Sequence, residues 1–192
     1  MPTLLLGSLF FSAPETIGVD IVAAQNRITI LILIFFITFL SPALAIYYLY
    51  RIGYITSLHV ETLSERRLPY LITLFFYGFG AYFFYQKLPE IGVDISLVLT
   101  AMACSIFFTA IISLYWQISA HAVGIGGVVG ALAAVIIKFG QTQLIYLFLG
   151  SVIVAGLVMS VRLQLNAHTP TQVGSGLILG IMVSTVAVLF FL

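Results

Sequence analysis

The residues best suited to chemistry lie in the stretch 160–172, whose sequence is Ser-Val-Arg-Leu-Gln-Leu-Asn-Ala-His-Thr-Pro-Thr-Gln. It places Arg162 and His168 where one apolar segment ends and another begins. Polar side chains in such surroundings are costly and by default mark a functional site. A second histidine, His121, stands at the start of another apolar segment.

Two histidines and several arginines suit phosphoryl transfer. One imidazole can attack phosphorus while the other protonates the leaving oxygen. Arginines bind phosphate oxygens through their forked N–H groups, and Arg66 and Arg67 join Arg162 as candidates. The structural alternative is that the arginine pair anchors lipid headgroups or pairs with Glu61 and Glu65. Either histidine taken singly would equally suit a hydrogen bond between helices.

Metal binding is the competing use of histidine. The chain has three histidines, but His59 stands in a polar segment without a ligand spacing, and no carboxylate is placed convincingly beside the others. The single cysteine, Cys104, lies in an apolar run and fits a small packing residue. We therefore predict neither a metal nor a cofactor.

Composition restricts the class of protein. The 192 residues are 62% hydrophobic and 7% charged, with a mean hydropathy of +1.22. Soluble domains carry about 25% charged residues, so this is an integral membrane protein. A net charge of +1 offers no basic face for nucleic acid. Outside the apolar segments no stretch is long enough to fold alone, so residues 1–192 are expected to form one membrane domain.

The elements that must position these residues are transmembrane helices. A span needs about 20 apolar residues, which predicts an all-α, polytopic helical bundle with six spans: 28–50, 70–86, 93–116, 119–137, 144–160 and 173–192. The apolar run 3–11 is half that length and predicts a short interfacial or half-inserted helix. Pro42 predicts a kink in the first span. The pairs Gly126/Gly130 and Gly176/Gly180 predict close helix packing.

Counting crossings brings the polar clusters to one membrane face. The segment 51–69 follows the first span, His121 begins the fourth, and the stretch 160–172 joins the fifth to the sixth. Two crossings separate each cluster from the next, so all three meet the same side.

The remaining basic residues indicate which side that is. Apart from the clusters, Arg27, Lys87 and Lys138 fall on the opposite side and Arg51 on the shared one. Positive residues favour the cytoplasmic side. We therefore expect an integral protein of a bacterial inner membrane, with the shared face outward.

With this layout, the motifs resemble those of the type-2 phosphatidic-acid phosphatase superfamily, which are integral-membrane lipid phosphatases. Three ordered segments carry the resemblance to its first, second and third signatures: Glu65-Arg66-Arg67-Leu-Pro69, Ser119-Ala-His121-Ala-Val-Gly124, and Arg162 followed after five residues by His168. The resemblance covers residues of about 28–192.

The resemblance implies a metal-independent phosphomonoesterase or diphosphatase that forms a phosphohistidine. His168 would be the nucleophile and His121 the acid for the leaving group. Four residues would bind phosphate: Arg66, Arg67, Ser119 and Arg162. The substrate would be a membrane lipid phosphate or a polyprenyl diphosphate.

The chain departs from the superfamily pattern in three places. The first signature lacks its lysine and has Leu68 before the proline, and Ala120 replaces the glycine of the second. Gln172 stands where an aspartate is expected, four residues after the nucleophile. In serine proteases, replacing the triad's aspartate by asparagine costs about 10⁴ in turnover through the wrong tautomer. Gln172 could orient the imidazole through its amide oxygen without supplying charge, or Glu61 or Glu65 could supply the carboxylate.

These departures define the alternatives. The leading hypothesis is a slow lipid phosphatase, and the second is a non-catalytic lipid-phosphate-binding protein of the same fold. A small transporter or channel is disfavoured, because the spans lack central charged residues and no inverted repeat is evident.

Overall fold

The computed structural model describes residues 2–55, 63–88 and 91–192, and side chains are described except at 63–65. Helices and no strands occur in these ranges. Six helices within them are long and apolar enough to cross a membrane: Ala24–Arg51, Arg66–Lys87, Gly92–Ile112, Ala120–Phe139, Thr142–Gln164 and Pro170–Phe191. The predicted all-α bundle of six spans is confirmed.

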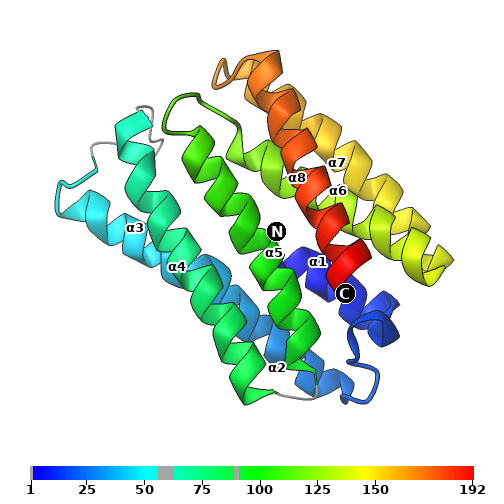
Figure 1. Cartoon of the computed structure of the whole chain (residues 1–192). Helices are drawn as coiled ribbons and strands as arrows, with labels where there is room; N and C mark the ends of the chain where they lie inside the picture. Colours follow the sequence, from blue (N-terminus) through cyan, green and yellow to red (C-terminus); the bar gives the residue numbers. More distant parts are fainter. Residues whose placement is uncertain (1, 56–62, 89–90) are drawn as a thin grey trace.

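The spans form two groups with a short helix between them (Figure 1). The first group contains α2 (Ala24–Phe35), α3 (Ser41–Arg51), α4 (Leu63–Lys87) and α5 (Gly92–Ile112). The second contains α6 (Ala120–Phe139), α7 (Ile145–Gln164) and α8 (Pro170–Phe191). Within the groups, α4 packs along α5 and α6 packs against both α7 and α8, while α5 meets α8 across the divide.

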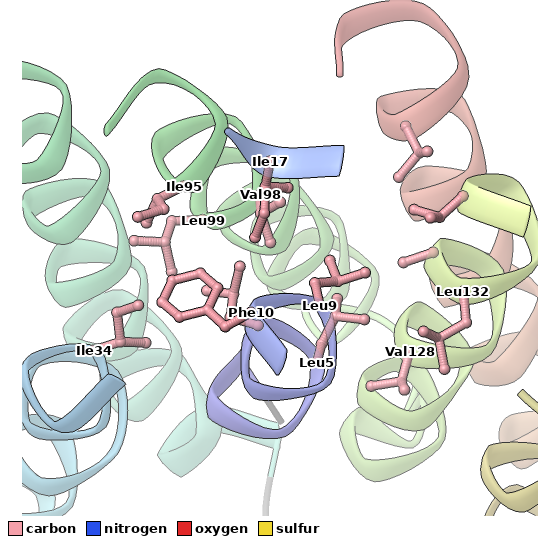
Figure 2. Close-up of a cluster of buried hydrophobic side chains, with 14 of the residues drawn as sticks. Leu5, Leu9, Phe10, Ile17, Ile34, Ile95, Val98, Leu99, Val128 and Leu132 are labelled. Atoms are coloured by element: carbon pink, nitrogen blue, oxygen red, sulfur yellow. The ribbon is translucent and has the colours of Figure 1, made fainter. Parts of the chain in front are cut away.

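The short helix is α1 (Pro2–Ser12), and the spans bury it. Leu5, Leu6, Leu9 and Phe10 expose 3% of their surface or less. Figure 2 shows Phe10 beside α5 and α2, whereas Leu5 and Leu9 face α6. The predicted short apolar helix is present, and it is a packing element that joins the two groups.

A hydrogen-bonded arginine fixes the end of α1. The Arg27 guanidinium donates to the Phe10 carbonyl oxygen at 2.8 Å and to the Val22 carbonyl oxygen at 2.7 Å. The last carbonyls of a helix have no partner within it, and a cation there also complements the helix dipole. Arg27 thus ties α1 to the start of α2.

Helices α6 and α8 run parallel and touch backbone to backbone. A Cβ on Gly126 would meet the Leu177 carbonyl oxygen, and one on Gly180 would meet the Val123 carbonyl oxygen. Cβ atoms on Gly130 and Gly176 would lie 2.6 Å from the Ile181 oxygen and 2.7 Å from the Ser119 oxygen. The close packing predicted from the two Gly-x-x-x-Gly pairs is confirmed. Glycines of each helix lie against carbonyl oxygens of the other.

Two prolines shape the first group. We predicted a kink at Pro42, and the structure has a π-helical turn, η2 (Phe36–Leu40), directly before Ser41–Arg51, within the continuous span Ala24–Arg51. Proline has no N–H and its ring clashes with the carbonyl four residues earlier, so the helix widens there. Pro69 lies inside α4, which begins at Leu63, earlier than the predicted start at 70. Arg66 and Arg67 are therefore helical residues.

The glycine contacts lead to a stability prediction. Gly180→Ala forces its methyl group against the Val123 carbonyl, whereas Gly174→Ala on the same helix meets open space. Overpacking costs about 1–3 kcal/mol, while alanine in place of glycine favours an exposed helix by ~1 kcal/mol. Thermal unfolding in detergent should show a lower Tm for Gly180→Ala and an unchanged or higher Tm for Gly174→Ala. Equal Tm values for the two variants would contradict the parallel contact.

Candidate functional site

Three segments that carry the predicted residues meet at one end of the bundle (Figure 1). They are the start of α4, the loop 113–119 before α6, and the turn 165–169 between α7 and α8. This is the arrangement expected from the count of crossings. His59 and Glu61 lie outside the described residues, as does the side chain of Glu65.

The turn before His168 begins with a helix cap that reverses the chain. The Ala167 N–H donates to the Arg162 carbonyl oxygen at 3.2 Å, and the Asn166 N–H donates to the Leu163 oxygen at 3.0 Å. Asn166 has a φ of 49°. This is a Schellman motif, and asparagine tolerates its left-handed position better than most residues. The motif fixes the start of the turn that leads from Arg162 to His168.

The turn ends with a capping box at the start of α8. Thr169 is the N-cap: its Oγ accepts from the Gln172 N–H, and its own N–H donates to Gln172 Oε1 at 3.1 Å. Pro170 occupies the first helical position, where a missing N–H costs least. His168 is thus held between two rigid caps.

Hydrogen bonds select one tautomer of the His168 imidazole. The side chain is 8% exposed. Its Nδ1 lies 3.1 Å from the Gln117 carbonyl oxygen and 3.2 Å from Gln172 Oε1. Gln172 Oε1 also accepts from the Thr169 N–H, so it is the oxygen that faces Nδ1. Both partners are acceptors, so the proton resides on Nδ1 and the lone pair on Nε2. This is the contact expected of an orienting glutamine.

Ser119 joins the starts of α6 and α8. Its side chain is fully buried and its Oγ accepts from the Ala122 N–H at 3.4 Å as the N-cap of α6. Its N–H donates to the Gln172 carbonyl oxygen at 3.3 Å. In these contacts Ser119 is a helix cap, and its phosphate contact stays a prediction.

Charges converge on the two histidines. The charge of Arg162 acts on both, and His168 also acts on His121. His121, in the first turn of α6, is exposed. Arg66 is half-buried and its charge acts on His168, whereas Arg67 is exposed. The topology therefore brings Arg66, Arg162 and both histidines together.

Arg162 presents a donor without an acceptor. It lies in the last turn of α7, where its charge complements the helix dipole. Its Nε is buried and has no hydrogen-bond partner in the described part of the chain. A buried donor left unsatisfied costs about 1–3 kcal/mol. An anionic oxygen at this position would satisfy it.

The surroundings hold His168 in its neutral form. Burial lowers the pKa of its imidazole below the ordinary value, and the positive charges of Arg162 and Arg66 lower it further. The hydrogen bonds to Gln172 and the Gln117 carbonyl oppose this shift. At neutral pH the site therefore combines two positively charged arginines with an unprotonated Nε2.

No family model, curated protein or solved structure matches this chain significantly. Among the described residues, no three histidine, cysteine, aspartate or glutamate side chains converge as metal ligands.

Three contributors to the site were missed from the sequence. The signal for Asn166 was an asparagine directly after a helical segment, and the signal for Thr169 was the Thr-Pro-x-Gln pattern of a capping box. The third contributor is the backbone carbonyl of Gln117, and a carbonyl carries no residue-type signal.

The tautomer assignment predicts a titration. Histidine NMR of the purified protein, assigned with His59→Asn and His121→Asn, should give His168 a pKa below that of an ordinary histidine side chain, with the proton on Nδ1. Gln172→Leu removes a hydrogen bond that favours the imidazolium and should lower this pKa further, whereas Gln172→Glu adds negative charge and should raise it. A pKa above the ordinary value in the wild type would contradict the described site.

Proposed function

We propose that this protein is a membrane phosphatase that hydrolyses a lipid phosphate or polyprenyl diphosphate through a phosphohistidine, without a metal. The observation that carries the proposal is the state of His168. Its Nδ1–H is occupied by two oxygen acceptors, which leaves Nε2 as the nucleophilic atom beside the charges of Arg66 and Arg162.

In the first step, His168 Nε2 attacks phosphorus and forms a P–N bond. The bond between phosphorus and the lipid oxygen breaks, and protonated His121 gives its proton to that oxygen. His121 is exposed, so it can regain a proton from water. The negative charge of a bound phosphate would favour its protonated form against the nearby positive charge of Arg162. Arg66 and Arg162 neutralise the charge that develops on the phosphate oxygens.

In the second step, water attacks the phosphorus of the phosphohistidine. Neutral His121 takes a proton from that water, the P–N bond breaks, and inorganic phosphate leaves. His168 returns to its neutral form with the proton still on Nδ1, and His121 is again protonated. The cycle consumes one water and needs no further reactant.

The phosphate site also uses backbone dipoles. The N-termini of α6 and α8 lie together at this end of the bundle, joined by the hydrogen bond from Ser119 to Gln172. Helix N-termini favour anions, and two parallel helices add their effects. Together with the unsatisfied Nε of Arg162, these helix N-termini support a phosphate group as the ligand.

The proposed location is a bacterial inner membrane, with this end of the bundle facing outward.

A non-catalytic lipid-phosphate-binding protein is the second candidate. The observation that favours it is Gln172, which orients the imidazole without a negative charge to stabilise its cationic form. A binding protein would need the arginines and the helix N-termini but not the nucleophile. The two candidates differ in whether phosphate is released.

The nucleophile assignment predicts a metal-independent reaction. Purified protein given an alkyl phosphate or a polyprenyl diphosphate should release inorganic phosphate in the presence of chelator. His168→Ala should abolish release, since no neighbouring group can form the covalent bond. His121→Ala should slow alkyl phosphates by about 10²–10⁴ and diphosphates less, because their leaving group needs protonation least. Retained binding without release from the wild type would favour the binding protein.

Because Gln172 is an uncharged partner of His168, we predict that a carboxylate in its place increases turnover. Gln172→Asp would place a carboxylate against the Nδ1–H and stabilise the imidazolium-like phosphohistidine, so turnover should rise severalfold. Gln172→Asn is the matched control, because it shortens the side chain equally without adding charge. Phosphate release measured under saturating substrate separates the two. A Gln172→Asp variant no faster than Gln172→Asn would argue against orientation by charge as the limiting factor.

A further inference from the structure

An elongated cavity of about 340 Å³ lies between the two groups of helices. Its lining along α6 runs from Ala120 to Val135, which corresponds to ~22 Å of helix at a rise of 1.5 Å per residue. The hydrocarbon core of a bilayer is about 30 Å thick. The lining therefore extends over most of the thickness of the hydrocarbon core.

One end of the cavity reaches the candidate phosphate site. Tyr70 lines it one helical turn after Arg66, and Ala120 lines it directly before His121. Gly124, one turn further along α6, also contributes to the wall. A ligand with its phosphate at the histidines would therefore have the cavity in front of its first carbons.

The walls are mostly apolar, although six of the lining side chains carry a hydroxyl group, and two of these six are Tyr70 and Tyr77. Tyr77 is hydrogen-bonded to the Thr38 side chain. The serine and threonine hydroxyls donate within their own helices, to carbonyl oxygens 2.7–3.2 Å away: Thr73 to Pro69, Ser105 to Ala101, Thr109 to Ser105, and Ser184 to Gly180. Satisfied hydroxyls make no demand on a ligand. Among the described residues the cavity thus favours hydrocarbon over a polar molecule.

Helix α1 bounds the cavity away from the phosphate site. Pro2, Leu5 and Leu9 line it, and Figure 2 shows Leu5 and Leu9 opposite Val128 and Leu132 of α6. The hydrogen bonds of Arg27 and the burial of its apolar face hold α1 in place. A chain entering from the histidines would meet α1 before leaving the bundle.

We infer that this cavity receives a single hydrocarbon chain of the lipid substrate and that α1 limits the length of that chain. The volume is at the low end of the ~300–1,000 Å³ of small-molecule pockets, yet it extends along the helices, a shape that suits one extended chain. The inference rests on the proposed function, because the substrate's phosphate would lie at the histidines.

Filling the cavity with a larger side chain tests whether a hydrocarbon chain occupies it. Gly127 lines it, and a Cβ there meets no atom within 4 Å. It lies seven residues after Ala120, ~10 Å along α6. In a detergent without an alkyl chain, Gly127→Leu should weaken hexadecyl phosphate at least tenfold and octyl phosphate little. Gly156→Leu is the control, since Gly156 is exposed and also has open space. Equal affinities of Gly127→Leu and Gly156→Leu for hexadecyl phosphate would overturn the inference.

Shortening a side chain of α1 that lines the cavity tests whether α1 limits the length of the bound chain. Leu9→Ala should shift tightest binding toward longer chains in a series from octyl to icosyl phosphate, because the cavity gains depth. Leu4→Ala removes the same atoms from a side chain that is 70% exposed and should leave the profile unchanged. A Leu9→Ala profile identical to that of Leu4→Ala would exclude α1 as the limit. If Leu9→Ala does not fold, Leu9→Val is the milder substitute.

Hexadecanol separates this inference from the proposed function. Hexadecanol has no phosphate. Its own affinity, measured by displacement of hexadecyl phosphate, should therefore fall in Gly127→Leu but not in Arg162→Ala. Arg162→Ala should weaken hexadecyl phosphate at least tenfold. If Gly127→Leu acts on both ligands while Arg162→Ala acts on neither, the cavity inference stands and the phosphate site falls. If Gly127→Leu acts on neither ligand, the cavity inference falls, whatever Arg162→Ala does.

Discussion

The contact between the backbones of α6 and α8 is the constraint on which the site depends. Four glycines allow each helix to reach carbonyl oxygens of the other, and no larger residue fits without displacing them. Because the two helices are parallel, their N-termini arrive at the same level, and Ser119 and Gln172 join them by a hydrogen bond. In a membrane, where apolar burial does not drive helices together, such packing is what sets their relative position. His121 lies in the first turn of α6 and His168 in the turn before α8, so this packing also positions the two histidines.

In the proposed reaction, Gln172 would set a balance between phosphate binding and turnover. An aspartate there would be attracted to Arg66 and Arg162 and would cancel part of their field, whereas an amide leaves that field for an anion. The amide still fixes the tautomer of His168, because its oxygen is held by the Thr169 N–H of the capping box. It gives up the negative charge that would stabilise a cationic imidazole. In the proposed phosphatase, a glutamine would therefore favour phosphate affinity and an aspartate would favour rate.

At the opposite end of the bundle, basic side chains donate hydrogen bonds to carbonyl oxygens near the ends of helices. Arg27 donates to the end of α1, and Lys138 donates to the carbonyl oxygens of Val188 and Leu189 near the end of α8 at 3.1 and 2.9 Å. The Gln141 side chain donates to Glu15, which links the segment after α1 to the connection between α6 and α7. Of the residues that enter the positive-inside count, Arg27 thus also holds the end of α1, and Lys138 joins α6 to the end of α8.

The sequence by itself determined the six spans and the common side of the polar clusters, because hydrophobic length defines a span and each crossing changes the side. It also determined the close approach of α6 and α8, which depends on glycines at fixed spacing. The capping box at Thr169 has a signal of the same kind, although we did not predict it. Only the tertiary structure decided that Arg66 is half-buried near His168 while Arg67 is exposed, since this depends on the rotation of α4 about its axis. It likewise decided that Ser119 is buried as a cap, that the Gln117 carbonyl faces His168, and that α1 lies inside the bundle. Those outcomes follow from how helices pack against one another, and no single segment of the sequence contains that information.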